Sequence, residues 1–128
     1  MNNEVMQWLD FANTDLNVAK HLDNSFFPKP LEIICYHCQQ AAEKAIKALI
    51  ISRGAAGGMP QKHDLSFLLG QLRNTLDIPD RYYDIADSLT PYGVRVRYPG
   101  EMEVTEKNAA DAIRASESLL LWIKSNME

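Results

Sequence analysis

The sequence predicts an all-α protein, folded as an up-and-down bundle of four or five helices. Apolar residues recur at steps of three and four along most of the chain, which is the period of one helix face. No run of alternating Val, Ile and Thr is long enough to predict a strand. Most connections between the periodic segments are short, which favours helices that run antiparallel to their neighbours in sequence.

The first helix is predicted over residues 6–22, and Pro28 and Pro30 end it, because proline lacks an N–H and disfavours helix in the residue before it. The second, over residues 31–53, is the longest periodic segment and stops at Gly54, which suits a left-handed cap. Its apolar residues fill one broad arc of a helical wheel. The opposite arc carries Tyr36, His37, Gln40, Glu43, Lys44 and Lys47.

Three further helices are predicted, over residues 65–76, over residues 80–89 and from Thr105 onward. Asp64 is the expected N-cap of the first of these, and Pro79 suits the first turn of the second. Residues 90–104 lie between the predicted helix over residues 80–89 and the last helix. This segment contains two prolines and two glycines and is predicted to be an ordered loop. Long structured loops in small domains usually have a function.

Length and composition are those of one domain over residues 1–128. A chain of 128 residues buries roughly two thirds of the surface that its unfolded form exposes, so its core needs no disulfide or metal. Apolar residues make up 46% and charged residues 23%, which excludes a disordered chain, a coiled-coil rod and a collagen-like fibre. The net charge of -4 argues against sequence-blind attraction to nucleic acid and still allows a local basic patch.

The two cysteines, Cys35 and Cys38, have C-x-x-C spacing, but no second such pair follows and the three histidines form no H-x3-5-H motif. Both lie on the apolar side of the second helix, so they are predicted to be core thiols. No metal or cofactor is expected. Residues 1–10 do not resemble a secretory signal, and no apolar run approaches a membrane span, so we expect a cytoplasmic chain without a membrane partner.

The only dense basic cluster is Arg95-Val96-Arg97-Tyr98. Two guanidinium groups two residues apart, flanked by Tyr92 and Tyr98, are suited to hold a phosphate while a ring stacks on a base.

A structural role for the same arginines remains open. They could pair with Glu101 and Glu103 or bond to carbonyls at helix ends. In that case they tie the loop to the bundle and bind no ligand.

His37, Gln40, Lys44 and Lys47 form a polar stripe along the second helix. Two interpretations of this stripe are open: its side chains act as an acid, a base or an anion-binding group, or they form a solvated helix face. Asp15 lies on the apolar side of the first helix, where an unpaired carboxylate is costly. We therefore expect a cationic partner, Lys44 or a loop arginine, in a structural ion pair; a catalytic acid is the alternative.

No arrangement of nucleophile and base is specific enough to name a catalytic residue. Cys38 follows His37 in the chain, but neighbouring residues on a helix point about 100° apart, which disfavours an activating hydrogen bond. His63 precedes the capping Asp64, where the pair is expected to anchor the loop.

Four blocks together resemble the HEPN domain, the higher eukaryotes and prokaryotes nucleotide-binding family. They are F-A-x-x-D-L-x-x-A-K at 11–20, Y-H-C-Q-Q-A-A-E-K-A-I-K-A-L-I at 36–50, P-x-K-H-D-L-x-x-L-L at 60–69 and A-D-S-L-T-P-Y-x-V-x-x-R-Y-P at 86–99. They occur in the family's order, and the resemblance extends over about residues 5–124.

This resemblance implies a helical bundle that commonly dimerises and is often encoded beside a small nucleotidyltransferase in a toxin–antitoxin-like module. Many members cleave RNA with an R-x4-6-H motif, but this chain has no histidine after His63, so no catalytic residue carries over. The R-Y-P block maps onto Arg97, Tyr98 and Pro99. The block in the second helix maps onto His37, Gln40, Glu43, Lys44 and Lys47.

We expect a non-catalytic HEPN-like domain that binds a nucleotide or RNA phosphate and associates with itself or with a nucleotidyltransferase. One alternative is a metal-independent ribonuclease that uses His37 or His63 with Arg97. Another is a purely structural dimeric interaction domain. The predicted ligand-binding residues are Arg95, Arg97, Tyr98, Tyr92, His37, Lys44 and Lys47.

Overall fold

The computed structural model describes residues 2–54, 64–93 and 103–127. Within these residues every regular element is helical and no strand occurs, which confirms the all-α prediction. The elements are α1 (Asn3–Ser25), α2 (Leu31–Ser52), α3 (Leu65–Gly70), α4 (Asp80–Leu89), the 3-10 helix η1 (Thr90–Gly93) and α5 (Glu106–Ser125).

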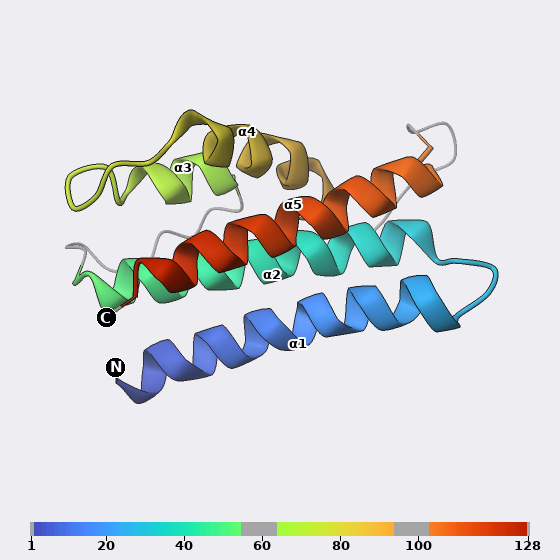
Figure 1. Cartoon of the computed structure of the whole chain (residues 1–128), viewed down its shortest axis with the longest axis horizontal. Helices are drawn as coiled ribbons and strands as arrows, with labels where there is room; N and C mark the ends of the chain where they lie inside the picture. Colours follow the sequence, from blue (N-terminus) through green and yellow to red (C-terminus); the bar gives the residue numbers. More distant parts are fainter. Residues whose placement is uncertain (1, 55–63, 94–102, 128) are drawn as a thin grey trace.

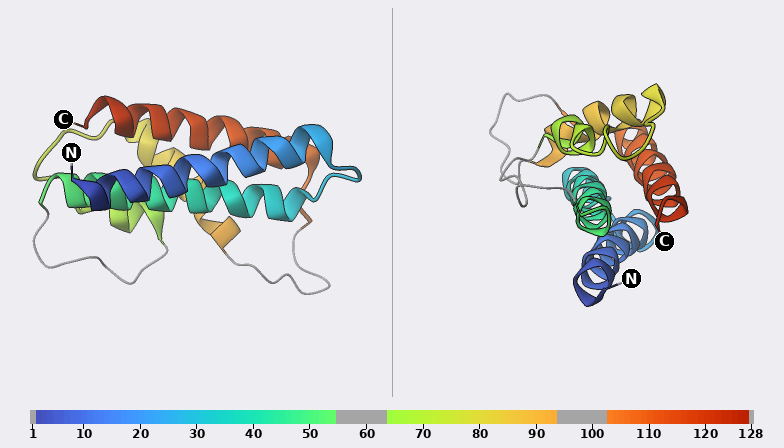
Figure 2. Two further views of the ribbon diagram at one scale, coloured as in Figure 1. Left: turned by 90° about the horizontal axis from the view of Figure 1, so that it is seen from below. Right: turned by 90° about the vertical axis from the view of Figure 1, so that its left-hand side faces the viewer.

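Helix α2 is the centre of the bundle. Helices α1 and α2 form a long antiparallel hairpin, and α5 lies along α2 on its other side (Figure 1). An end view places α3 and α4 across α2 from α1 (Figure 2). Because α2 has neighbours on several sides, few of its side chains remain fully exposed.

The core consists of aliphatic side chains with many alanines on α2. Ala41, Ala42, Ala45 and Ala48 have no exposed surface, and such small residues let neighbouring helices approach closely. The largest buried side chains surround them from four helices: Ile34, Ile46, Leu49, Leu65, Leu68, Leu69, Leu89, Leu119, Leu120 and Ile123. These contacts hold α2 in a fixed orientation.

Side chains cap three of the helices. The Asn2 side chain accepts a hydrogen bond from Val5 N at 2.9 Å, and the predicted cap Asp64 accepts one from Phe67 N at 3.1 Å. Thr105 and Asn108 form a reciprocal capping box that fixes the start of α5.

Helix α3 is shorter than expected, since it ends at Gly70 and not near residue 76. Beyond it the backbone bonds span three residues: Gln71 N donates to Leu68 O, and Leu72 N donates to Leu69 O. Glycine is a poor helix former, and the tighter turns still bury Leu72 completely. The apolar spacing therefore marked the buried positions correctly but not the length of the helix.

Both cysteines are free thiols with no exposed surface, as the sequence predicts. Burial raises the pKa of Cys38 to about 12, which makes the thiolate rare near neutral pH. The described part of the chain contains no group of His, Cys, Asp and Glu that could hold a metal ion. None of its helices is both long and apolar enough to cross a bilayer.

Candidate functional site

Asp15 joins α1 to α2 through both oxygens of its carboxylate. His37 Nδ1 lies 2.8 Å from Asp15 Oδ1, and Lys44 Nζ lies 2.6 Å from Asp15 Oδ2. The Asp15 side chain is only 12% exposed, so its charge has little contact with water and needs these partners. His37 and Lys44 are two helical turns apart, which places them on one face of α2. Of the partners expected for Asp15, Lys44 is the cation that the structure brings to it, and His37 is a second partner that the sequence did not predict.

The Asp15 contact also fixes the orientation of the His37 ring. Its Nδ1 is engaged by the carboxylate, so Nε2 is the nitrogen that remains to contact a ligand. The ring of Tyr36 stands edge-on to the imidazole with 5.6 Å between centroids, which further restricts it. A carboxylate that orients an imidazole while an ammonium lies beside it is an arrangement suited to proton transfer near a phosphate.

A second ionic group lies further along α2, around Glu43. Glu43 Oε1 accepts a hydrogen bond from Gln39 Nε2 at 3.1 Å, and Oε2 accepts one from Lys47 Nζ at 2.9 Å. Gln39 Oε1 in turn accepts from Gln40 Nε2 at 2.7 Å. Gln39 is completely buried and Glu43 is only 5% exposed. A spacing of four residues brings Gln39, Glu43 and Lys47 together on successive turns.

We call these residues of α1 and α2 the α1–α2 polar cluster: Asp15, His37, Gln39, Gln40, Glu43, Lys44 and Lys47. The cluster differs from the solvated face that was the alternative for this stripe. Its members on α2 are all buried or half-buried, because α1 and η1 cover much of that side of the helix.

Aromatic rings of α1 border the polar cluster. Lys44 Nζ lies 6.0 Å from the centroid of Phe11, and Lys47 Nζ lies 5.6 Å from that of Trp8. Phe11 is 56% exposed. The sequence analysis gave Phe11 and Trp8 no role beside the lysines. The signal was available, because an antiparallel hairpin pairs early residues of α1 with late residues of α2.

Formal charges within the cluster balance. Lys44 and Lys47 are each paired with a carboxylate, Asp15 and Glu43 respectively. With His37 neutral the cluster has no surplus of positive charge. An anion bound here therefore needs further cations, from a protonated His37 or from another part of the chain.

The loop that contains the predicted arginines begins beside this cluster. Helix η1 packs on α2, and a Cβ added to Gly93 would lie 3.1 Å from Gln39 Cδ. Tyr92, in the same turn, is half-buried against the core. Arg95, Arg97 and Tyr98 lie outside the described residues, as does His63.

A family model and two solved structures match the chain, and the family model and one of the structures name the same family. The archaeal HEPN homologue ST0689 superposes with a TM-score of 0.79 and 25% identity, covering 99% of this chain and 100% of that chain. TT1696 from Thermus thermophilus superposes with a TM-score of 0.81 and 26% identity, covering 97% of this chain and 98% of that chain. No curated protein matches the chain. The family model described as HEPN domain matches residues 5–126.

Proposed function

Because the chain belongs to the HEPN domain family, we propose that it is a non-catalytic HEPN domain that binds the phosphate of a nucleotide or an RNA. One observation carries this proposal. The chain enters the segment with Arg95 and Arg97 from Gly93, which lies against Gln39 within the α1–α2 polar cluster. In this proposal the two arginines supply the positive charge that the balanced cluster lacks, and Phe11, which is 56% exposed, stacks on a base.

A binding titration tests this proposal. ATP, GTP and a short single-stranded RNA are titrated into the wild type and into an Arg95→Ala/Arg97→Ala variant. We expect the variant to bind the preferred ligand at least about tenfold more weakly, because two guanidinium contacts to phosphate are lost.

An Arg73→Ala/Arg114→Ala variant is the matched control, since it removes the same charge from exposed positions on other elements. It should bind like the wild type. Equal affinity in all three proteins, or no binding to any of them, contradicts the proposal.

The proposal extends to partners and location. The domain forms a homodimer in the cytoplasm and associates with a nucleotidyltransferase in a toxin–antitoxin-like module, as its family suggests. Co-expression with a small nucleotidyltransferase encoded next to it should give a complex that survives gel filtration. Separate elution of the two proteins counts against this part.

The Asp15–His37 pair favours a second candidate function, a metal-independent ribonuclease. Its 2.8 Å contact holds the imidazole as a base is held in proton transfer, and Lys44, paired with the other oxygen of Asp15, lies beside it. RNA is incubated with the protein in EDTA, with His37→Ala and His63→Ala variants as controls. Cleavage that only His37→Ala abolishes supports this function, and intact RNA at high protein concentration ends it.

A further inference from the structure

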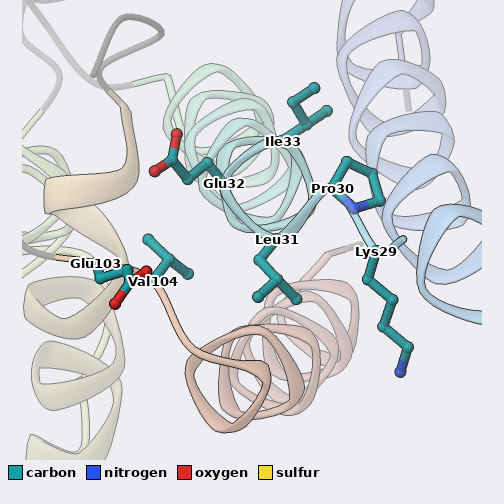
Figure 3. A pocket seen from close by; sticks show the side chains of 7 residues that line it. All are labelled: Lys29, Pro30, Leu31, Glu32, Ile33, Glu103 and Val104. Carbon is teal, nitrogen blue, oxygen red and sulfur yellow. The ribbon is translucent and has the colours of Figure 1, made fainter. Parts of the chain in front are cut away.

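A second site lies at the opposite end of the hairpin from the chain termini, away from the α1–α2 polar cluster. A cavity of about 330 Å³ opens between the start of α2 and the residues that precede α5 (Figure 3). It shares no residue with the polar cluster. Its lining consists of Lys29, Pro30, Leu31, Glu32, Ile33, Glu103 and Val104.

The wall of this cavity combines apolar and charged side chains. Leu31 and Val104 are half-buried and pack against the core, so this part of the surface is held by the rest of the bundle. Pro30 and Ile33 extend the apolar lining toward solvent, and Ile33 is 52% exposed. The volume is at the lower end of the range for ligand pockets and suits one long side chain.

Charge at the cavity is unevenly distributed. Lys29, the one cation among the described residues of the lining, is paired with Asp23 at 3.3 Å. Glu32 and Glu103 are exposed and have no ion pair with any residue that the structure describes. Both carboxylates lie on one side of the cavity, and Lys29 extends on the other (Figure 3). The site therefore combines an apolar wall with negative charge that no cation of the described chain neutralises.

We infer that this cavity receives an arginine side chain from a partner protein. The three methylene groups of arginine match the apolar wall formed by Leu31 and Val104. Its planar guanidinium has five N–H donors and suits two carboxylates better than the single ammonium of lysine does. Charge complementarity thus selects the chemistry of the occupant.

Exposed apolar side chains that are next to the lining residues in sequence favour an arginine that belongs to a protein over a free small cation. Phe26 and Phe27, in the segment that joins α1 to α2, are 55% and 69% exposed. Together with Ile33 they place three large exposed apolar side chains within eight residues of sequence. A small cation leaves these side chains in water, whereas a protein segment around an anchoring arginine covers them.

The test follows amide signals of the full chain by NMR during titration with a short capped peptide that has one arginine between apolar residues. The same peptide with citrulline is the neutral comparison, because citrulline keeps the shape of the side chain and lacks its charge. We expect the arginine peptide to shift the signals of Leu31, Ile33 and Val104, with an affinity at least about tenfold higher than that of the citrulline peptide.

Two variants and one smaller probe complete the design. Glu32→Gln/Glu103→Gln should abolish the preference for arginine, while Glu4→Gln/Asp77→Asn, which removes two exposed carboxylates elsewhere, should preserve it. Capped arginine amide alone should bind more weakly than the peptide. The peptide's advantage should disappear in a Phe26→Ser/Phe27→Ser variant.

Two outcomes overturn the inference. If Glu32→Gln/Glu103→Gln lowers stability but keeps the preference for arginine, the two carboxylates serve only the nearby helix N-termini. If capped arginine binds as tightly as the peptide, the site takes a small cation and no protein partner. Neither outcome bears on the RNA titration, which uses other residues.

Discussion

Asp15 is a single charged residue that fastens α1 to α2, and its two oxygens have different partners. The sequence was enough to predict that this carboxylate needs a cation, because it recurs with Ala12, Leu16 and Ala19 on the inner face of α1. The choice of Lys44 depended on how the two helices are aligned. Spacing along the chain contains no information about that alignment.

We predict that Asp15→Asn lowers the free energy of unfolding by about 2 kcal/mol, because it leaves half-buried Lys44 and His37 without their anionic partner. Urea unfolding followed by circular dichroism measures this loss. Asp10→Asn, on the exposed side of the same helix, is the control and should change stability little. An equal effect of the two substitutions means that the contact at Asp15 does not stabilise the hairpin.

Thiol reactivity is a second property that belongs to single residues. Burial raises the pKa of Cys38 from 9.0 to about 12, so the folded protein holds the neutral thiol. The raised pKa of Cys38 makes a contribution to the free energy of unfolding that is fully present below pH 9 and is lost as the pH rises toward 12. We expect DTNB to label neither thiol quickly in the folded protein at pH 8, and both thiols at once in guanidinium. Fast labelling of the folded protein at pH 8 disproves the buried placement.

At the scale of elements, η1 packs against α2 at Gly93, a residue that has no side chain. Gly93 lies against the buried amide of Gln39, which Glu43 and Gln40 hold in place. The sequence predicted only an ordered loop here. It did not predict the short 3-10 helix, because turns of this kind depend on a close approach to another element.

We predict that Gly93→Ala destabilises the fold by about 1–3 kcal/mol, because the added Cβ would lie 3.1 Å from the Gln39 side chain, which would have to shift against its hydrogen bonds to Glu43 and Gln40. Gly70→Ala is the matched control, since its Cβ would meet only the end of Arg73 at 3.7 Å. Combining Gly93→Ala with Gln39→Ala in a double-mutant cycle should reveal a coupling between the two positions. Strict additivity rejects the proposed contact.

For the whole molecule, the exposed apolar surface favours self-association. The described residues leave seven large apolar side chains exposed, including Met6 and Phe11 on α1 and Leu121 on α5. Where such side chains form one contiguous patch, the patch is typical of a surface that binds another copy or a partner.

We predict that light scattering gives a mass about twice the 14.5 kDa of one chain. If folding is coupled to dimerisation, the urea midpoint also rises with protein concentration. A mass of one chain at high concentration, with a midpoint independent of concentration, shows that the domain is a monomer when alone.

The sequence by itself determined the helical class, most helix boundaries and the buried thiols, because periodicity, caps and prolines act within a few residues. It located α2, α4 and the start of α5 closely. The first helix was predicted over residues 6–22, three residues short of α1 at each end, and the predicted end of α3 was too late because the chain forms tighter turns after Gly70. The tertiary structure decided which polar residues meet. His37 reached Asp15, and Gln39 and Glu43 became buried, because α2 is enclosed by neighbours that approach it from distant parts of the chain.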